Sequence, residues 1–251
     1  MPFETNLEYS IVIPVRDESG NIAPLVVEIV AAMDSLSGSP LYEIIYVDDG
    51  STDGTSAELL KIASTTDQLR IISHLRPCGQ SQALITGISS ALGSWIITLD
   101  GDGQNNPSDI SLLIKRRDAA MSTEPDLAQR FLYLGHRHHR FDSLSRRYQS
   151  WLANDLRGWL LGDHTPDAGC GLKLFSLDLF LELPRFDALH RFLPALVNRA
   201  GGRSISIQVS HRPRLRGQSK YGLWSRLCLG VVDLIGVIWL IARETRPDIK
   251  E

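Results

Sequence analysis

The stretch 95–107 (WIITLDGDGQNNP) constrains the fold of this chain more than any other. It begins with an apolar run rich in β-branched residues, which is typical of a buried parallel strand. Three polar side chains then follow at alternate positions, Asp100, Asp102 and Gln104. In an extended chain such positions point the same way at steps of about 6.6 Å, too far apart for one ion. The intervening glycines let the chain curl, so the three side chains are able to converge.

These three side chains predict a metal site at the end of a strand, where open α/β sheets bind their ligands. Two carboxylates and an amide oxygen suit Mg²⁺ or Mn²⁺, so we expect Asp100, Asp102 and Gln104 to hold one of these ions. Asn106 and Pro107 then have the residue types of an N-cap and a first helical residue. The alternative is an ordinary polar turn between strand and helix, because Asp and Gly are common turn residues.

The periodicity of apolar residues predicts the fold class. In the first half it predicts strands at 9–15, 41–47, 70–75 and 94–99, and helices at 21–36, 53–65 and 80–92. Strands and helices that alternate at this spacing imply a parallel sheet with helices on both faces. In the second half it predicts a helix from 107 to about 121, strands near 131–136, 171–175 and 203–209, and helices at 143–161 and 189–200. The predicted class is α/β with a mostly parallel sheet.

Charge is divided unevenly along the 251 residues. Residues 1–128 carry 7 Lys+Arg and 18 Asp+Glu, whereas residues 129–251 carry 19 and 11, for a total net charge of −3. An acidic half and a basic half suit a protein that binds a cation with one part and phosphate with the other, although solvated surface charge would look the same. The three cysteines are far apart, which indicates a reducing compartment and argues against a thiolate zinc site.

Four motifs in order resemble the family 2 glycosyltransferases, and within them the dolichyl-phosphate mannose synthase-like branch, which uses polyprenyl phosphates. The resemblance covers roughly residues 9–222. Its motifs are 11–18 (IVIPVRDE), 46–55 (YVDDGSTDGT), 100–104 (DGDGQ) and 211–221 (HRPRLRGQSKY). It implies the GT-A fold of nucleotide-diphospho-sugar transferases. It also implies a catalytic domain at 1–222, with a nucleotide- and metal-binding half (1–128) and an acceptor half (129–222).

The resemblance implies a donor site made by several of these motifs. Both aspartates of the 100–104 motif take catalytic roles and, with Gln104, hold the metal. The basic loop at 211–221 folds over the donor. The residues implied to bind the nucleotide-sugar are Pro14, Arg16, Glu18, Asp48, Asp49, Asp100, Arg214 and Lys220. A divalent ion and basic side chains at a diphosphate stabilise the charge that develops as the glycosidic bond breaks.

On the acceptor side the resemblance implies that Arg137, Arg146 and Ser150 hold a lipid phosphate. Arg146 and Ser150 are four residues apart, so on a helix they share a face. A phosphate acceptor is already ionised near neutral pH and needs no strong general base. Asp167, a further residue with an implied catalytic role, belongs to the block 167–173 under the acceptor site, where it orients a group or caps a helix.

The tail 223–251 contains the most apolar stretch of the chain, 227–242. This stretch is shorter than a membrane span and carries Asp233 at its middle. We expect a helix that lies in the membrane interface and could also join two copies of the chain. A buried core helix is the alternative.

Together these features predict a metal-dependent, inverting glycosyltransferase. It would move a sugar from GDP-mannose or a UDP-hexose to a polyprenyl phosphate at the cytoplasmic membrane face, with no nucleic acid partner. One alternative is a family 2 transferase with a soluble glycan acceptor, but the acidic pair that such an acceptor needs is not evident. A nucleotidyltransferase would open with a Gly-rich basic loop, whereas residues 14–18 are acidic. A non-catalytic scaffold is disfavoured by the intact metal motif.

Overall fold

The computed structural model describes residues 7–137, 158, 160–163, 165–213 and 223–243, with side chains from residue 230 onward in the last segment. The predicted alternation of strands and helices in the first half is confirmed, with ends that differ by a few residues. The elements are β1 (Tyr9–Val15), α1 (Ile22–Asp34), β2 (Tyr42–Asp48), α2 (Thr55–Ala63), β3 (Leu69–Ser73), α3 (Gln80–Ser89) and β4 (Trp95–Thr98). The central strands β1 and β2 are almost wholly buried because helices cover both faces of the sheet.

The second half supplies the rest of one seven-stranded sheet, whose order is β3-β2-β1-β4-β6-β5-β7. Its strands are β5 (Phe131–Arg137), β6 (Lys173–Ser176) and β7 (Arg203–Val209). β6 runs antiparallel to both of its neighbours, whereas the other neighbouring pairs are parallel. The chain moves outward from β1 to β3 and then returns to place β4 on the other side of β1. The carboxyl ends of β1 and β4 therefore form a topological switch point, where open sheets bind ligands.

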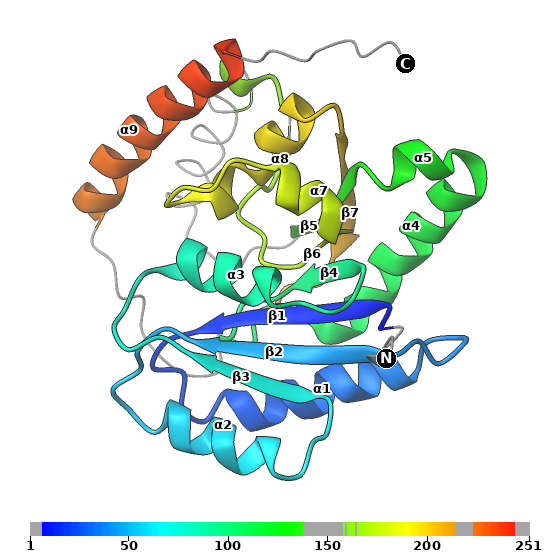
Figure 1. The fold of residues 1–251 in the computed structure, drawn as a ribbon, viewed down its shortest axis with the longest axis vertical. Coiled ribbons are helices and arrows are strands. Elements are labelled where there is room, and N and C mark those ends of the chain that lie inside the picture. The colour runs from blue at the N-terminus through cyan, green and yellow to red at the C-terminus, as the bar shows by residue number, and fades with distance from the viewer. Residues whose placement is uncertain (1–6, 138–157, 159, 164, 214–222, 244–251) are drawn as a thin grey trace, which may run out of the picture.

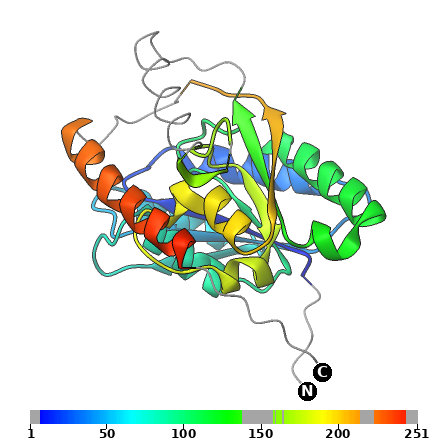
Figure 2. The same cartoon turned by 90° about the horizontal axis from the view of Figure 1, so that it is seen from above.

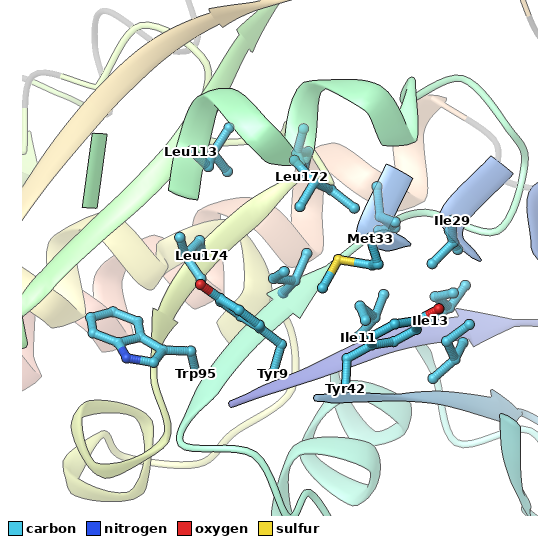
Figure 3. Close-up of a cluster of buried hydrophobic side chains, with 14 of the residues drawn as sticks. Tyr9, Ile11, Ile13, Ile29, Met33, Tyr42, Trp95, Leu113, Leu172 and Leu174 are labelled. Atoms are coloured by element: carbon cyan, nitrogen blue, oxygen red, sulfur yellow. The ribbon is translucent and has the colours of Figure 1, made fainter. Parts of the chain in front are cut away.

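Helices cover both faces of the sheet (Figures 1 and 2), and two hydrophobic clusters hold them there. One cluster packs α1 and α4 (Ile110–Thr123) on one face, with Tyr9, Met33 and Leu172 among its members (Figure 3). The other cluster packs α3, α8 (Leu189–Arg199) and α9 (Leu223–Ala242). Shorter helical elements are η1 (Pro107–Asp109), α5 (Pro125–Ala128) and α7 (Leu177–Glu182). The sequence did not predict α7, a six-residue helix capped by Ser176.

The strand-to-helix turn after β4 has the predicted cap. The Asn106 side chain accepts a hydrogen bond from Ser108 N, and Pro107 is the first helical residue. The first turn is a 3₁₀ turn, and the α-helix α4 begins only at Ile110. Most of the helix predicted at 143–161 lies outside the described residues.

Helix α9 is apolar on two faces. On one face Val237 is buried in the same cluster as Phe192 and Leu193 of α8. The opposite face exposes large apolar side chains, namely Val231, Val232, Ile235, Ile238 and Trp239. The core helix, which was the alternative, thus describes the face on α8, whereas the interfacial helix stays a prediction for the exposed face. Across the described part of the chain, no helix is both long enough and apolar enough to cross a bilayer.

Candidate active site

The metal motif lies at the carboxyl end of β4, beside the end of β1. Gly101 packs so closely on β1 that a Cβ atom there would lie 2.4 Å from Val15 Cγ1. Asp100 is partly exposed and accepts a hydrogen bond from Gln80 Nε2 at 3.0 Å. Asp102 is 7% exposed, and its Oδ1 accepts from the backbone N–H of Gln104 at 3.1 Å. The chain therefore curls after β4, as the two glycines of the motif predict.

The electrostatics of this turn fit a divalent cation. Burial, and secondarily the charge of Asp102, raise the pKa of Asp100 to about 6. Two neighbouring carboxylates that disfavour each other's ionisation are relieved by a shared cation. The candidate donors at Asp100, Asp102 and Gln104 are oxygen atoms, which suit Mg²⁺ or Mn²⁺ better than a soft metal. The residues of the predicted metal site therefore fit the ions expected for them.

A second strand end brings a cation to the same edge of the sheet. Arg137, at the end of β5, donates from Nε to Asp167 Oδ2 at 2.7 Å and from Nη2 to Asp167 Oδ1 at 2.8 Å. Asp167 is fully buried. Burial by itself would lower the pKa of Arg137, but Asp167 outweighs it, so the pKa is raised and the guanidinium stays charged. Of the two roles left open for Asp167, the structure supports orientation, and the oriented group is Arg137.

The predicted donor and acceptor motifs meet at Gly171. A Cβ atom on Gly171 would lie 2.3 Å from Asp100 Oδ2, so the Asp100 carboxylate rests on the backbone of the acceptor block. Thr98 Oγ1 donates to Gly171 O at 2.7 Å and fixes that backbone. Gln80 and Lys173 also interact with Asp100. The sequence analysis gave neither of them a role, because they are distant from residue 100 along the chain and belong to no local metal motif.

Asp48 and Asp49, which were predicted to bind the nucleotide-sugar, make hydrogen bonds within the protein. Asp48 accepts from Ser51 N at 3.0 Å and from the Ser56 hydroxyl. Asp49 accepts from Cys78 N at 2.7 Å and from Gly79 N at 2.8 Å. These bonds shape two loops at the carboxyl ends of β2 and β3.

The Asp49 carboxylate is the centre of a latch between β2 and α3. Its Oδ1 lies 2.8 Å from His74 Nδ1, and His74 Nε2 lies 3.0 Å from Thr86 Oγ1. One ligand atom from each of Asp49, His74 and Cys78 lies within 4.8 Å of the other two, a spacing that a metal ion would accept. Both Asp49 oxygens already accept backbone hydrogen bonds, so we interpret this cluster as a latch that fixes the loop before α3.

We expect Asp49→Asn to lower the free energy of unfolding by about 1–3 kcal/mol, because the amide NH₂ cannot accept the bonds that the carboxylate accepts. Burial would raise the pKa of Asp49, but the hydrogen bonds from Cys78, His74 and Gly79 outweigh it and hold the pKa below its usual value. The stabilisation is therefore complete above the unfolded-state pKa of about 4 and is lost as the pH falls below it. Urea unfolding at pH 7 and pH 3 tests this. A difference between the two proteins that does not shrink at pH 3 would contradict it.

The first motif lies on the same edge of the sheet. Pro14 is within β1, and Arg16 follows it with a side chain 43% exposed. Glu18 accepts from Asn21 Nδ2 at 2.7 Å, and its backbone N–H donates to Thr55 Oγ1 at 2.9 Å. The loop after β1 is therefore tied to the start of α2.

Arg212 holds the segment after β7 against residues 104 and 105 of the turn after β4. The sequence analysis gave Arg212 no role. Its guanidinium donates to both carboxylate oxygens of Glu28, at 3.1 and 2.7 Å, and to Asn105 O at 3.1 Å. Arg212 N also donates to Gln104 O at 3.0 Å. These contacts hold the start of the predicted basic loop beside the metal motif. The described residues do not include four of the predicted site residues, namely Arg146, Ser150, Arg214 and Lys220.

Comparison with known proteins identifies the family. The family model for glycosyl transferase family 2 matches residues 10–183. The chain belongs to this family. It is 36% identical over 246 residues to a dodecaprenyl-phosphate galacturonate synthase of Rhizobium johnstonii, an alignment that covers 96% of this chain and 70% of the relative. It is 34% identical to an undecaprenyl-phosphate 4-deoxy-4-formamido-L-arabinose transferase of Edwardsiella ictaluri, with coverage of 93% and 68%.

Solved structures agree on the fold of this glycosyltransferase. A mannosyltransferase of Pyrobaculum calidifontis, in complex with GDP-Man and Mn²⁺, matches with a TM-score of 0.64 at 18% identity, over 98% of this chain and 68% of that chain. A glucosyl-3-phosphoglycerate synthase of Mycobacterium tuberculosis, in complex with Mn²⁺, UDP-glucose and phosphoglyceric acid, matches with the same score and identity over 96% and 81%. The fold is GT-A, and the resemblance to the polyprenyl-phosphate branch is confirmed by the named relatives.

Proposed function

We propose that this glycosyltransferase moves a sugar from a nucleoside diphosphate to a polyprenyl phosphate, with a divalent cation in its active site. The observation that carries the proposal is the pairing of two sites on one edge of the sheet. Asp100 and Asp102 end one strand, Arg137 ends another, and Gly171 joins them. The first site suits a cation with a diphosphate, and the second suits a phosphate. The names of the relatives support the acceptor, and the Mn²⁺ complexes of the structural neighbours support the cation.

In the proposed mechanism, one set of residues binds the cation and another orients the acceptor phosphate. Asp100, Asp102 and Gln104 would hold Mg²⁺ or Mn²⁺, which stabilises negative charge on the departing diphosphate when it is bound. Arg137 uses Nε and Nη2 on Asp167, and its remaining N–H groups are suited to orient the acceptor phosphate. An oxygen of that phosphate attacks the anomeric carbon as the bond to the diphosphate breaks, which inverts the configuration. The phosphate is already ionised, so no side chain has to remove a proton.

The ion pair between Asp167 and Arg137 favours a phosphate acceptor over a hydroxyl group of a soluble glycan. A hydroxyl acceptor needs a general base within hydrogen-bond distance. Asp167 is the buried carboxylate of the acceptor block, and both of its oxygens accept hydrogen bonds from Arg137. A carboxylate held in a bidentate ion pair is a weak base, because the neighbouring cation favours its charged form.

A transfer screen tests the proposed function directly. The purified chain is incubated with Mg²⁺ or Mn²⁺, a short-chain polyprenyl phosphate, and GDP-mannose or one of several UDP-hexoses, and the lipid product is detected by mass spectrometry. We expect a glycolipid with at least one donor and none when the cation is chelated. Transfer to a soluble glycan in place of the lipid phosphate would overturn the acceptor assignment.

We also propose that the exposed face of α9 lies on the cytoplasmic surface of the membrane, where a lipid-linked acceptor is found. Val231, Val232, Ile235 and Trp239 are each more than half exposed and share one face of the helix. Such a contiguous apolar patch on a folded protein marks an interaction surface. In Figure 1 this helix flanks the second half of the chain, on the side of α8. A second copy of the chain is the other partner that this face could accept.

We expect Val232→Lys/Ile235→Lys to lower partitioning onto phosphatidylethanolamine–phosphatidylglycerol vesicles by at least about tenfold, because two apolar side chains lose their burial in lipid. The matched control is Val27→Lys/Leu60→Lys, which adds the same charges at exposed apolar positions of α1 and α2. Vesicle flotation measures the partitioning. Equal flotation of both variants, or a wild-type chain that dimerises and never floats, would contradict the membrane assignment.

A further inference from the structure

Lys173 is a buried cation beside the metal motif to which the proposed mechanism gives no role. It is 4% exposed at the start of β6, and it pairs in register with Thr98 of β4. Residues paired across antiparallel strands point to the same face, and so do alternate residues of one strand. Lys173, Thr98 and, two positions further on, Asp100 therefore share one face of the sheet. This is the face covered by α3, from which Gln80 reaches Asp100.

The charge of Lys173 acts on Asp100. Its Nζ donates to Cys170 O, a neutral acceptor that leaves the positive charge uncompensated by this contact. Burial is the largest effect on the pKa of Lys173 and holds it below its usual value, while the nearby acidic groups of Cys170, Asp100 and Asp167 oppose this effect in part. Arg137 differs from Lys173 because the carboxylate of Asp167, which accepts two hydrogen bonds from it, balances its positive charge.

We propose that Lys173 is a positioning residue whose fixed charge weakens the binding of the divalent cation and strengthens the binding of the nucleoside diphosphate, so that the site fills with cation when the donor is present. The inference rests on the proposed function, in which Asp100 and Asp102 hold the cation. Without donor, the ammonium of Lys173 repels a cation from a site with two carboxylates. With donor, the same charge attracts the diphosphate, whose oxygens add ligands and negative charge. Each ligand then increases the affinity for the other by the same factor.

The sign of this effect separates it from a structural role. Loss of a supporting side chain would weaken the binding of every ligand at the site. Loss of a repulsive charge strengthens cation binding and weakens diphosphate binding. We therefore expect Lys173→Met to bind Mn²⁺ at least about tenfold more tightly than the wild type in the absence of nucleotide, because even at an effective dielectric constant of about 20 a unit charge within about 10 Å of a divalent ion costs more free energy than a tenfold change in affinity.

The experiment titrates Mn²⁺ into the full chain and follows the electron paramagnetic resonance signal of the free ion, alone and with saturating UDP or GDP. In the wild type, nucleotide should tighten Mn²⁺ binding. In Lys173→Met the affinity for Mn²⁺ should rise by a similar factor with and without nucleotide, because a fixed charge acts on the cation in both states, and the affinity for nucleotide without Mn²⁺ should fall. Gln80→Met is the matched control, because it removes a hydrogen bond to Asp100 without changing charge, and it should weaken Mn²⁺ binding.

The outcomes separate the inference from the proposed function. A wild-type chain that binds no Mn²⁺ with either nucleotide would overturn the proposed metal site itself. A wild type that binds Mn²⁺, with a folded Lys173→Met that binds it equally or more weakly, would overturn only the role of Lys173. Circular dichroism and thermal unfolding establish that the variants are folded. If Lys173→Met is unfolded, Lys173→Gln decides by the same criterion, and Lys173→Arg, which keeps the charge, should restore the wild-type affinity for Mn²⁺.

Discussion

Asp102→Ala is expected to reduce sugar transfer about a thousandfold or more and to leave the fold intact. Loss of one carboxylate from a two-carboxylate cation site removes several kcal/mol of transition-state stabilisation, and about 4 kcal/mol corresponds to a thousandfold. Stability should change little, because relief of the repulsion between Asp102 and Asp100 offsets the loss of the hydrogen bond that Asp102 accepts from Gln104 N. The pKa of Asp100 should move down toward its usual value in the variant.

Initial rates of lipid glycosylation at saturating Mg²⁺ or Mn²⁺ measure the effect, and thermal unfolding checks the fold. Asp67→Ala is the matched control, because Asp67 is an exposed aspartate between α2 and β3 and should tolerate the change. Full activity of Asp102→Ala at saturating cation would remove Asp102 from the metal site. A large fall in melting temperature would instead show that the residue supports the turn.

Arg137→Ala should impair both the fold and the use of the acceptor. The substitution leaves the buried Asp167 carboxylate without its partner, which costs about 3–5 kcal/mol of stability. It also removes the cation that we assign to the acceptor phosphate. We expect the kcat/KM for polyprenyl phosphate to fall by about two orders of magnitude, since hydrogen bonds to charged groups at a desolvated site have large effects.

The double variant Arg137→Ala/Asp167→Ala separates the two effects. Without either charge no carboxylate is stranded, so most of the stability in urea unfolding should return. The activity should not return, because the phosphate still lacks its cation. Calorimetric titration of UDP or GDP should show little change in either variant. Nucleotide affinity that collapses together with the activity would assign Arg137 to the diphosphate of the donor.

The parts of this molecule that the sequence predicted are those with a local signal. The alternation from β1 to β4 follows from apolar periods of two and 3.6 residues, which each segment carries by itself. The turn at Asp100 follows from polar residues at alternate positions with glycines between them. The cap at Asn106 follows from residue type and a proline after it. Each of these features depends on residues that are close neighbours along the chain.

The features that the sequence did not reveal join residues far apart in the chain. Arg212 meets Glu28 across 184 positions, and Gln80 meets Asp100 across 20. The direction of β6 likewise depends on which strands flank it, and a four-residue strand has the same residue pattern in either direction. The hydrogen bonds that Asp49 accepts come from a loop 29 and 30 positions away. Asp49, which the sequence predicted only as a nucleotide contact, thus also fixes the position of the loop before α3.

The reversed direction of β6 has a consequence for how this enzyme can diversify. A parallel strand delivers to the active edge the residues that follow it, as β4 delivers Asp100. A strand that runs the other way delivers the residues that precede it, as β6 does with Asp167 and Gly171. Under the proposed function, the donor and the acceptor are therefore bound by separate segments of the sequence that meet at Gly171. Under the proposed function, exchanges confined to residues 165–170 should change the choice of acceptor without changing the loops assigned to the donor, whereas Gly171 has to remain because a Cβ atom there would meet Asp100.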